Sequence, residues 1–269
     1  MKLLRHGALL CLALSAVIAP RFASASDAQA FSMQSSVNQL YALANQARAM
    51  HGAAPLKWDP ALAASAMQHC TLMARARQIE HRYRNEADVP LRASQAGARF
   101  SLIEENIASG PYASGIHQGW MNSPEHRANL LNPAIDRIGL AIVARNGRLY
   151  AVADYARAVP TLTPLQVESA VAAQLRARGV AVLRDASQAR AYCASNGGFR
   201  AVGAPSLITR WQNSDVTQLP TDLSRQLASG AYRQAAVGSC PAQDQAASFT
   251  SYRVAVILYA AESAALPAH

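Results

Sequence analysis

One segment of the sequence has the pattern of a β-hairpin, and it fixes part of the fold. Residues 138–144 and 149–155 alternate in the manner of strands that bury one face. Between them stands Asn146-Gly147, a pair that favours the tight turn of an antiparallel hairpin. We therefore expect two antiparallel strands joined by a tight turn.

Helical patterns precede the hairpin. Asp59-Pro60 has the form of an N-cap followed by a first-turn proline, and Gly52 can end the helix before it. Leu56-Lys57-Trp58 is expected to be a short connector, and residues 82–97 a loop or short helices. The helices expected before the hairpin span residues 35–51, 61–78, 115–121 and 124–131.

The chain begins with the pattern of an export signal. A positively charged start precedes an apolar run over residues 8–19, and Ala23-Ser24-Ala25 offers the small residues of a cleavage site. A buried core helix is the alternative, but Pro20 and the polar stretch after it argue against one. No later segment has about 18 consecutive apolar residues. We expect removal of residues 1–25 and a secreted or periplasmic mature chain without a transmembrane segment.

The charge of the chain is basic but dispersed. There are 25 Lys and Arg against 16 Asp and Glu, and loss of residues 1–25 would reduce the excess from 9 to 6. No basic run is interleaved with aromatic residues, so no nucleic-acid groove is indicated. We expect a solvated basic surface, with weak attraction to anionic envelope polymers as the alternative.

Three cysteines follow the export signal. An oxidising compartment permits one disulfide among Cys70, Cys193 and Cys240 and leaves one thiol. Cys70 lies on a helix rich in Ala and Met, so we expect it to be a buried small hydrophobe. We predict that Cys193 and Cys240 pair across the C-terminal half. The sequence has no Cys-x-x-Cys, so a zinc ribbon or thioredoxin-like site has no support.

The C-terminal half has a different character. Residues 159–164 resemble a linker, and Thr163-Pro164 could open a helix over 165–178. The strands expected in this half span residues 232–239 and 252–259. The expected division is a first domain over 33–158 and a smaller α+β domain over 164–262.

The second half repeats the order of the first in outline. Arg190-Ala-Tyr-Cys193 stands where Met67-Gln-His-Cys70 stands in the first half, and Trp211-Gln-Asn-Ser214 resembles Trp120-Met-Asn-Ser123. One interpretation is a degenerate, shrunken copy of the first half. Such a copy would place one or two helices against a small antiparallel sheet and would pack its tryptophan as in the first half. An unrelated α+β domain is the alternative, because short matches arise by chance.

Two imidazoles and a carboxylate, His81, His126 and Glu105, stand beside expected element boundaries. Ser123-Pro124 has the pattern of an N-cap with a first-turn proline, so His126 belongs to the start of a helix, and Ser123 is a capping residue rather than a nucleophile. Neutral His81 and His126 could bind a divalent metal such as zinc, with Glu105 as a ligand or as an acceptor that orients a ring. Alternatively, the three groups hydrogen-bond one another and pin loops to the core.

The first half also carries short motifs in a fixed order. They are Asn45-Gln-Ala-Arg48, Leu56-Lys-Trp58, His81, Glu105-Asn-Ile-Ala108, Trp120-Met-Asn-Ser-Pro-Glu-His-Arg127, Asn129-Leu-Leu131 and Ile138-Gly139. In this order they resemble the CAP superfamily of cysteine-rich secretory proteins, antigen 5 and pathogenesis-related 1 proteins, and most of all its bacterial secreted branch. The resemblance covers roughly residues 37–155.

This resemblance implies an α+β fold, an α-β-α sandwich in which helices cover a central antiparallel sheet. It also implies a cleft lined by two histidines and acidic residues. His81, Glu105 and His126 match three of the family's four cleft positions. The fourth, often Glu in eukaryotic members, falls at or near Ser123, and this departure removes a carboxylate. Family members are linked to sterol or lipid binding, host interaction and, in some cases, proposed proteolysis, so the fold implies no shared reaction.

We therefore expect an exported, non-enzymatic CAP protein. It would bind a ligand, a lipid or an envelope component through a cleft that holds His81, Glu105, His126 and Ser123. The alternative is a hydrolase of peptide or envelope substrates that uses the same His/Glu cleft, with or without a divalent metal at His81 and His126.

Overall fold

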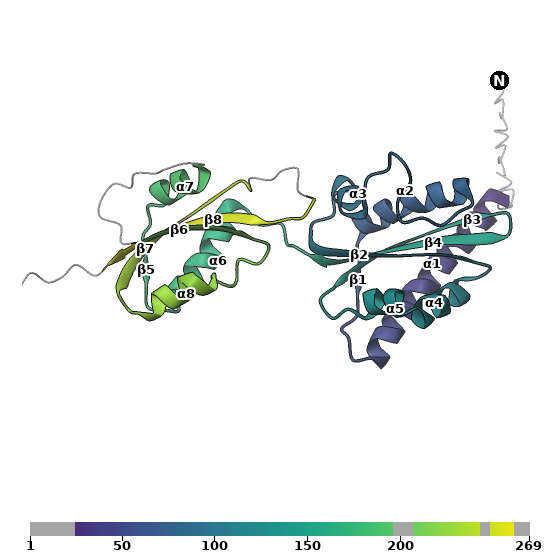
Figure 1. The fold of residues 1–269 in the computed structure, drawn as a ribbon, viewed down its shortest axis with the longest axis horizontal. Coiled ribbons are helices and arrows are strands. Elements are labelled where there is room, and N and C mark those ends of the chain that lie inside the picture. The colour runs from purple at the N-terminus through teal and green to yellow at the C-terminus, as the bar shows by residue number, and fades with distance from the viewer. Residues whose placement is uncertain (1–24, 196–206, 243–247, 261–269) are drawn as a thin grey trace, which may run out of the picture.

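The computed structural model describes residues 25–195, 207–242 and 248–260. They form two lobes, each with helices packed on its own four-stranded sheet (Figure 1). We call residues 25–158 the first lobe and the described residues from 159 onward the second lobe. The export signal expected over residues 1–25 lies outside the described residues except for Ala25. Within the described ranges, no helix is long and apolar enough to cross a membrane.

The first lobe is an α-β-α sandwich, as the sequence predicts. Its elements are α1 (Ala25–Met50), β1 (Lys57–Trp58), α2 (Pro60–Ala76), α3 (Val89–Gln95), β2 (Phe100–Gly110), α4 (Ala113–Asn122), α5 (Pro124–Leu131), β3 (Arg137–Arg145) and β4 (Arg148–Ala158). The strand order is β1-β3-β4-β2, with β1 parallel to β3 and the other pairs antiparallel. Helices α2 and α3 cover one face, and α1, α4 and α5 cover the other (Figure 1).

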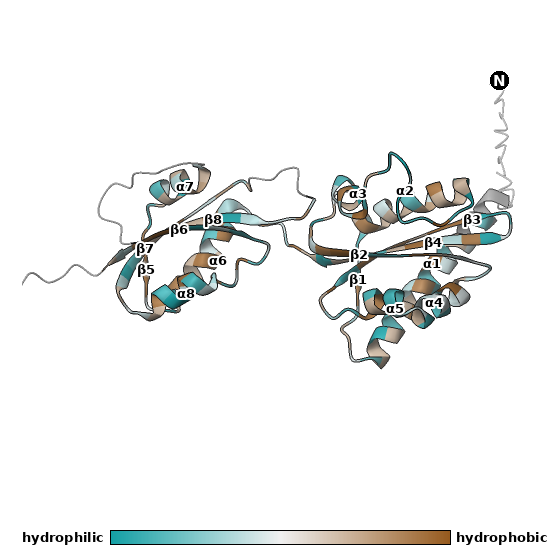
Figure 2. Ribbon diagram, in the orientation of Figure 1, coloured by the Kyte–Doolittle hydropathy of each residue, from teal (hydrophilic) through white to brown (hydrophobic). Residues whose placement is uncertain are grey.

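Local signals in the sequence account for several of these elements. The Asp59 carboxylate accepts from the Ala61 and Leu62 amides and so caps α2. Asn146 and Gly147 both have positive φ, as a two-residue hairpin turn requires. The strands between the helical layers are mainly hydrophobic, which fits their burial on both faces (Figure 2).

One charged side chain is part of the core of the first lobe. The Arg48 guanidinium is fully buried and donates hydrogen bonds to four main-chain carbonyls. These belong to Ala54 at 2.7 Å, Leu130 and Asn132 at 2.9 Å each, and Ile135 at 3.3 Å. Arg48 thereby ties α1 to the end of α5, where helix carbonyls lack partners within the helix.

The second lobe has the same strand order. Its elements are α6 (Pro164–Arg176), β5 (Ala181–Val182), α7 (Ser187–Ala194), β6 (Leu207–Asn213), α8 (Thr221–Ala228), β7 (Tyr232–Cys240) and β8 (Tyr252–Ala260). The sheet order is β5-β7-β8-β6, with β5 parallel to β7 and the other pairs antiparallel. Each strand therefore takes the place of one strand of the first lobe, and α7 lies on the opposite face from α6 and α8 (Figure 1).

The two sheets also share their register. Ile138 of β3 pairs with β1 and lies opposite Tyr155 of β4. Ala235 of β7 pairs with β5 and lies opposite Leu258 of β8 in the same way. This agreement in order and register is what a reduced copy of the first lobe predicts.

The details of that copy differ from the sequence prediction in two respects. The second lobe has three helices in its described part, not one or two, and its sheet includes a parallel pair. The proposed match between Trp211 and Trp120 is wrong, because Trp120 lies on α4 whereas Trp211 lies on β6. Counted from the shared register, Trp211 takes the place of Ala108 on β2.

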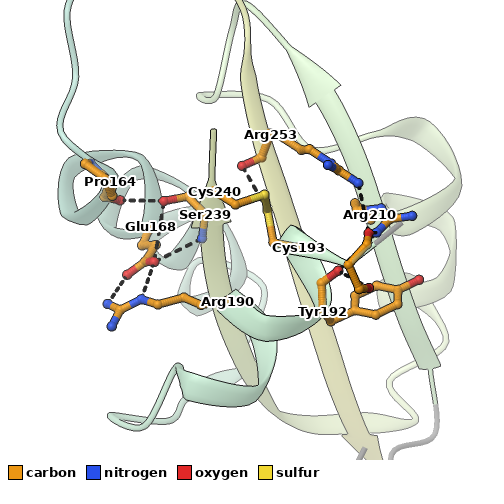
Figure 3. The surroundings of a disulfide bond; sticks show 10 residues. Pro164, Glu168, Arg190, Tyr192, Cys193, Arg210, Ser239, Cys240 and Arg253 are labelled. Atoms are coloured by element: carbon orange, nitrogen blue, oxygen red, sulfur yellow. Dashed lines mark hydrogen bonds and ion pairs between the residues drawn. A yellow bond between two sulfur atoms is a disulfide. The ribbon is translucent and has the colours of Figure 1, made fainter. Parts of the chain in front are cut away.

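The predicted disulfide between Cys193 and Cys240 is present and joins α7 to β7, with the Cα atoms 5.7 Å apart (Figure 3). Cys70 is a free, buried thiol, as predicted, and burial raises its pKa to about 12. Cys70 and Cys193 occupy corresponding places. Their sulfurs lie 3.0 Å and 3.4 Å from the carbonyl oxygens of Tyr150 and Arg253, which are equivalent positions on β4 and β8.

Candidate functional site

The candidate site is built on β2, the outermost strand of the first sheet. Glu105 lies in the middle of this strand, directly opposite Asp154 on β4. Opposite residues of an antiparallel pair project from the same face of the sheet, so the two carboxyl groups are neighbours. Both are buried, Asp154 completely.

Two basic side chains meet Glu105. One oxygen, Oε1, lies 2.8 Å from Nδ1 of His81, in the loop between α2 and α3. The other, Oε2, accepts a short hydrogen bond from the buried Arg92 guanidinium on α3. The His81 side chain is 59% exposed although its partner is buried. The hydrogen bond to Glu105 raises the pKa of His81, against the opposing effects of burial and of Arg92.

The Asp154 carboxyl holds its proton to a higher pH than an exposed aspartate does. Its complete burial, followed by the negative charge of Glu105, raises its pKa to about 8. The Ser65 hydroxyl on α2 donates to Asp154 Oδ2 at 2.7 Å. The protonated form of Asp154 is therefore favoured, because two neighbouring buried carboxylates would repel each other.

The network continues inward to a second histidine. His69 on α2 is fully buried, and its Nδ1 lies 2.7 Å from Glu86 Oε1. Arg92 also approaches Glu86, with its Nη1 at 3.4 Å from the same oxygen. Arg92 therefore links the pair formed by His69 and Glu86 to the pair formed by His81 and Glu105.

His126 approaches from the helical layer on the other face. It lies in the first turn of α5, and its carbonyl accepts a hydrogen bond from the Asn106 side chain on β2 at 2.9 Å. Asn129 in turn donates to Asn106 Oδ1 at 3.0 Å. Burial lowers the pKa of His126, and the positive charge of His81 lowers it further. Because β2 has no neighbour on its outer side among the described strands, side chains from both layers can approach each other around that edge.

Of the four residues expected from the sequence, the structure brings His81 and Glu105 into direct contact. His126 makes no direct contact that joins it to His81 in the described residues; after burial, the charge of His81 is the second cause that lowers the pKa of His126. Ser123 occupies the N-cap position of α5, followed by Pro124 as expected, but its hydroxyl makes no capping hydrogen bond.

The donors around Glu105 do not fit a metal centre well. Both carboxylate oxygens already accept from cationic side chains, and the His81 nitrogen that faces Glu105 is engaged. In the part of the chain that the structure describes, no group of three or more His, Cys, Asp or Glu side chains is arranged to hold a metal ion. Structural and catalytic zinc sites need at least three such ligands.

Sequence reasoning did not identify five members of the network. These are Ser65, His69, Glu86, Arg92 and Asp154. A usable signal existed for Ser65 and His69, which lie four residues apart and therefore on one face of an otherwise apolar helix. Asp154 stands within an apolar strand pattern, where a buried acid needs an explanation.

Comparisons with known proteins place the match in the first lobe. Residues 41–155 match the sequence description of the CAP family, given as "Cysteine-rich secretory protein family". The uncharacterized membrane protein YlbC of Bacillus subtilis is 32% identical over 111 residues, which is 40% of this chain and 31% of that protein. The chain therefore matches less than a third of that relative's length.

Solved structures show a similar but partial correspondence. An extracellular protein containing an SCP domain from Bacillus anthracis is 24% identical with a TM-score of 0.46, over 51% of this chain and 45% of that one. An outer surface protein from Borrelia burgdorferi is 22% identical with a TM-score of 0.44, over 46% of this chain and 94% of that one.

Proposed function

Because residues 41–155 of this chain form a domain of the CAP family, we propose that it is an exported, non-enzymatic protein that binds a ligand or envelope partner through His81, Glu105 and His126. The exposed His81 ring would make the contact, and the buried groups behind it would fix its orientation and charge. His126 would supply the second imidazole from α5.

The proposal rests on the hydrogen bonds that the Glu105 carboxylate accepts. A general base or a metal ligand needs a free lone pair directed at its target. Both oxygens of Glu105 are instead directed at His81 and Arg92. Such a carboxylate is suited to holding His81 in one orientation and favouring its protonated form, so that the outer edge of the ring can donate to an acceptor on a ligand.

The candidate nucleophiles near the site also favour binding over hydrolysis. The Ser65 hydroxyl is buried and donates to Asp154. Cys70 is buried, and its pKa of about 12 keeps it a thiol at neutral pH. Ser123 caps α5 by position, and its hydroxyl is not paired with an imidazole of the described residues, although activation of a serine requires such a base.

Export is supported by the disulfide between Cys193 and Cys240, since structural disulfides persist in oxidising compartments. The signal-like pattern of residues 1–25 agrees with it. The match to the CAP family does not identify a reaction, because proteins with one fold can have many different functions.

A binding experiment with matched variants tests the proposal. The mature protein is incubated with peptidoglycan sacculi and with lipid vesicles, and its turnover of casein and of p-nitrophenyl acetate is measured alongside. We expect saturable binding to the sacculi or the vesicles, no turnover, and a loss of about tenfold in affinity in His81→Gln and Glu105→Gln. His51→Gln, which changes an exposed histidine at the end of α1, should bind like the wild type.

Three outcomes would overturn the proposal. Turnover that disappears in His81→Gln would identify a hydrolase. Binding that EDTA abolishes and zinc restores would identify a metal-dependent site. If the wild type binds neither sacculi nor vesicles, the protein has no envelope partner of these kinds. If all variants bind equally well, His81 has no role in binding.

A further inference from the structure

The second lobe contains a hollow that the CAP match does not cover. Its volume is about 230 Å³, and residues of α6, of the segment after β5, of α7 and of β7 line it. Its charged lining residues are Glu168 and Arg176 of α6, Arg184 of the loop after β5, and Arg190 of α7. We call this feature the arginine hollow.

One arginine is held rigidly in place. Arg190 donates from Nε and Nη2 to the two oxygens of Glu168 at 2.8 Å and 2.7 Å (Figure 3). Glu168 Oε1 also accepts the main-chain N–H of Ser239 on β7 at 3.0 Å. This fixes the Arg190 guanidinium at the wall of the hollow, and its Nη1 takes no part in the pair with Glu168.

The other two arginines have no partner in the described part of the chain. Arg176 and Arg184 make no hydrogen bond or ion pair there and are exposed. Asp185 follows Arg184, and its carboxylate accepts a hydrogen bond from the Ser187 amide in the loop before α7. Among the charged side chains that line the hollow, Glu168 pairs with Arg190, so Arg176 and Arg184 are the two positive charges there without an ion-pair partner in the described part of the chain.

Arg184 and Arg190 have no charged counterpart in the first lobe. The sequence match between the two halves places Met67 of the first lobe where the second lobe has Arg190. The paired registers of β1 and β5 place Pro60 where the second lobe has Arg184. The second lobe therefore has its own charged surface at a position where the first lobe is uncharged.

We propose that the arginine hollow binds a phosphate group. Guanidinium groups pair with phosphate through two parallel hydrogen bonds, and three guanidiniums offer more donors than the two oxygens of a carboxylate can accept. Leu165 and Leu183, 64% and 37% exposed, also line the hollow. The ligand would therefore carry an uncharged portion beside its phosphate, as a soluble phosphate ester or a phospholipid headgroup does. This inference is separate from the site around His81.

The test uses the mature full-length protein and a charge-matched control. The variant Arg176→Ala/Arg184→Ala removes the two uncompensated charges and leaves the pair between Arg190 and Glu168 intact. The control Arg178→Ala/Arg225→Ala removes the same charge from just after α6 and from α8. Probes are inorganic phosphate, followed by calorimetry, and vesicles of phosphatidylglycerol or of phosphatidylcholine, followed by sedimentation.

We expect the first variant to lose about tenfold in affinity while the control stays within about twofold of the wild type. Saturable binding of free phosphate without vesicle binding would support a soluble ester, and binding of phosphatidylglycerol vesicles alone would support a lipid headgroup. Equal losses in the two variants would show a diffuse charge effect and overturn the proposal. So would the absence of binding to every probe, or binding to phosphatidylcholine as strong as to phosphatidylglycerol.

Discussion

The substitution Asp154→Asn tests the physical state of the buried carboxyl pair. Asp154 is fully buried opposite Glu105, and burial together with the Glu105 charge raises its pKa from 3.8 to about 8. Asparagine has nearly the same shape and, like the protonated acid, can accept from Ser65 and donate to a neighbour. It differs in having no proton to lose.

The magnitude follows from the proton balance. The unfolded chain releases this proton near pH 3.8, whereas the folded chain keeps it up to about pH 8. Between these values the folded state binds one more proton than the unfolded state, so the free energy of unfolding falls by about 1.4 kcal/mol per pH unit as pH rises. The whole window corresponds to a loss of about 6 kcal/mol, which the asparagine variant does not suffer.

The assay is urea denaturation at several pH values, with the fluorescence of Trp58 and Trp120 followed in a Trp211→Phe background, because both remaining tryptophans lie in the first lobe. Between about pH 5 and about pH 8, the Asp154→Asn protein should gain about 4 kcal/mol relative to the wild type. Glu125→Gln, at an exposed acid of α5, serves as the control and should follow the wild type. If the free energy of unfolding changes with pH in the same way for Asp154→Asn and the wild type, then Asp154 is ionised throughout this pH range and the reasoning is refuted.

Three further substitutions test the packing of the first lobe. Arg48→Ala leaves four main-chain carbonyls, two of them in buried hydrogen bonds, without their donor and should cost at least about 3 kcal/mol in urea denaturation. A change below about 1 kcal/mol would contradict that role. Val143→Cys places a cysteine at the position equivalent to Cys240. It should form a disulfide with Cys70 that adds at most about 4 kcal/mol to the free energy of unfolding. If the equivalence is false, non-reducing peptide mapping would show two free thiols. Gly139→Ala would place a Cβ 2.1 Å from a main-chain nitrogen of α2 and should lower stability by about 1–3 kcal/mol, whereas an unchanged melting temperature would disprove that contact.

Elements with strong local signals could be predicted from the sequence. The cap at Asp59 and the turn at Asn146-Gly147 depend on neighbouring residues alone, and both occur as expected. Strand β2 was not identified, because the polar residues Glu104, Glu105 and Asn106 interrupt its apolar pattern, and the last two of them belong to the site. The connector expected at Leu56-Lys57-Trp58 includes β1, which is too short to show a period.

The candidate site was only partly accessible to sequence reasoning. The motif order located His81, Glu105 and His126, but contacts between distant segments determine what these residues touch. Arg92 reaches Glu105 from α3, and Asp154 meets it only through the register of β2 and β4. Such pairings are set by tertiary packing, which leaves no fixed spacing in the sequence.

The most direct test of the shared site is an NMR titration of His126 in the protein with His81→Gln. The charge of His81 lowers the pKa of His126, so its removal should raise that pKa, while the control His51→Gln should leave it unchanged. A pKa of His126 that is the same in His81→Gln as in the wild type would contradict the account, because His81 and His126 would then not belong to one site.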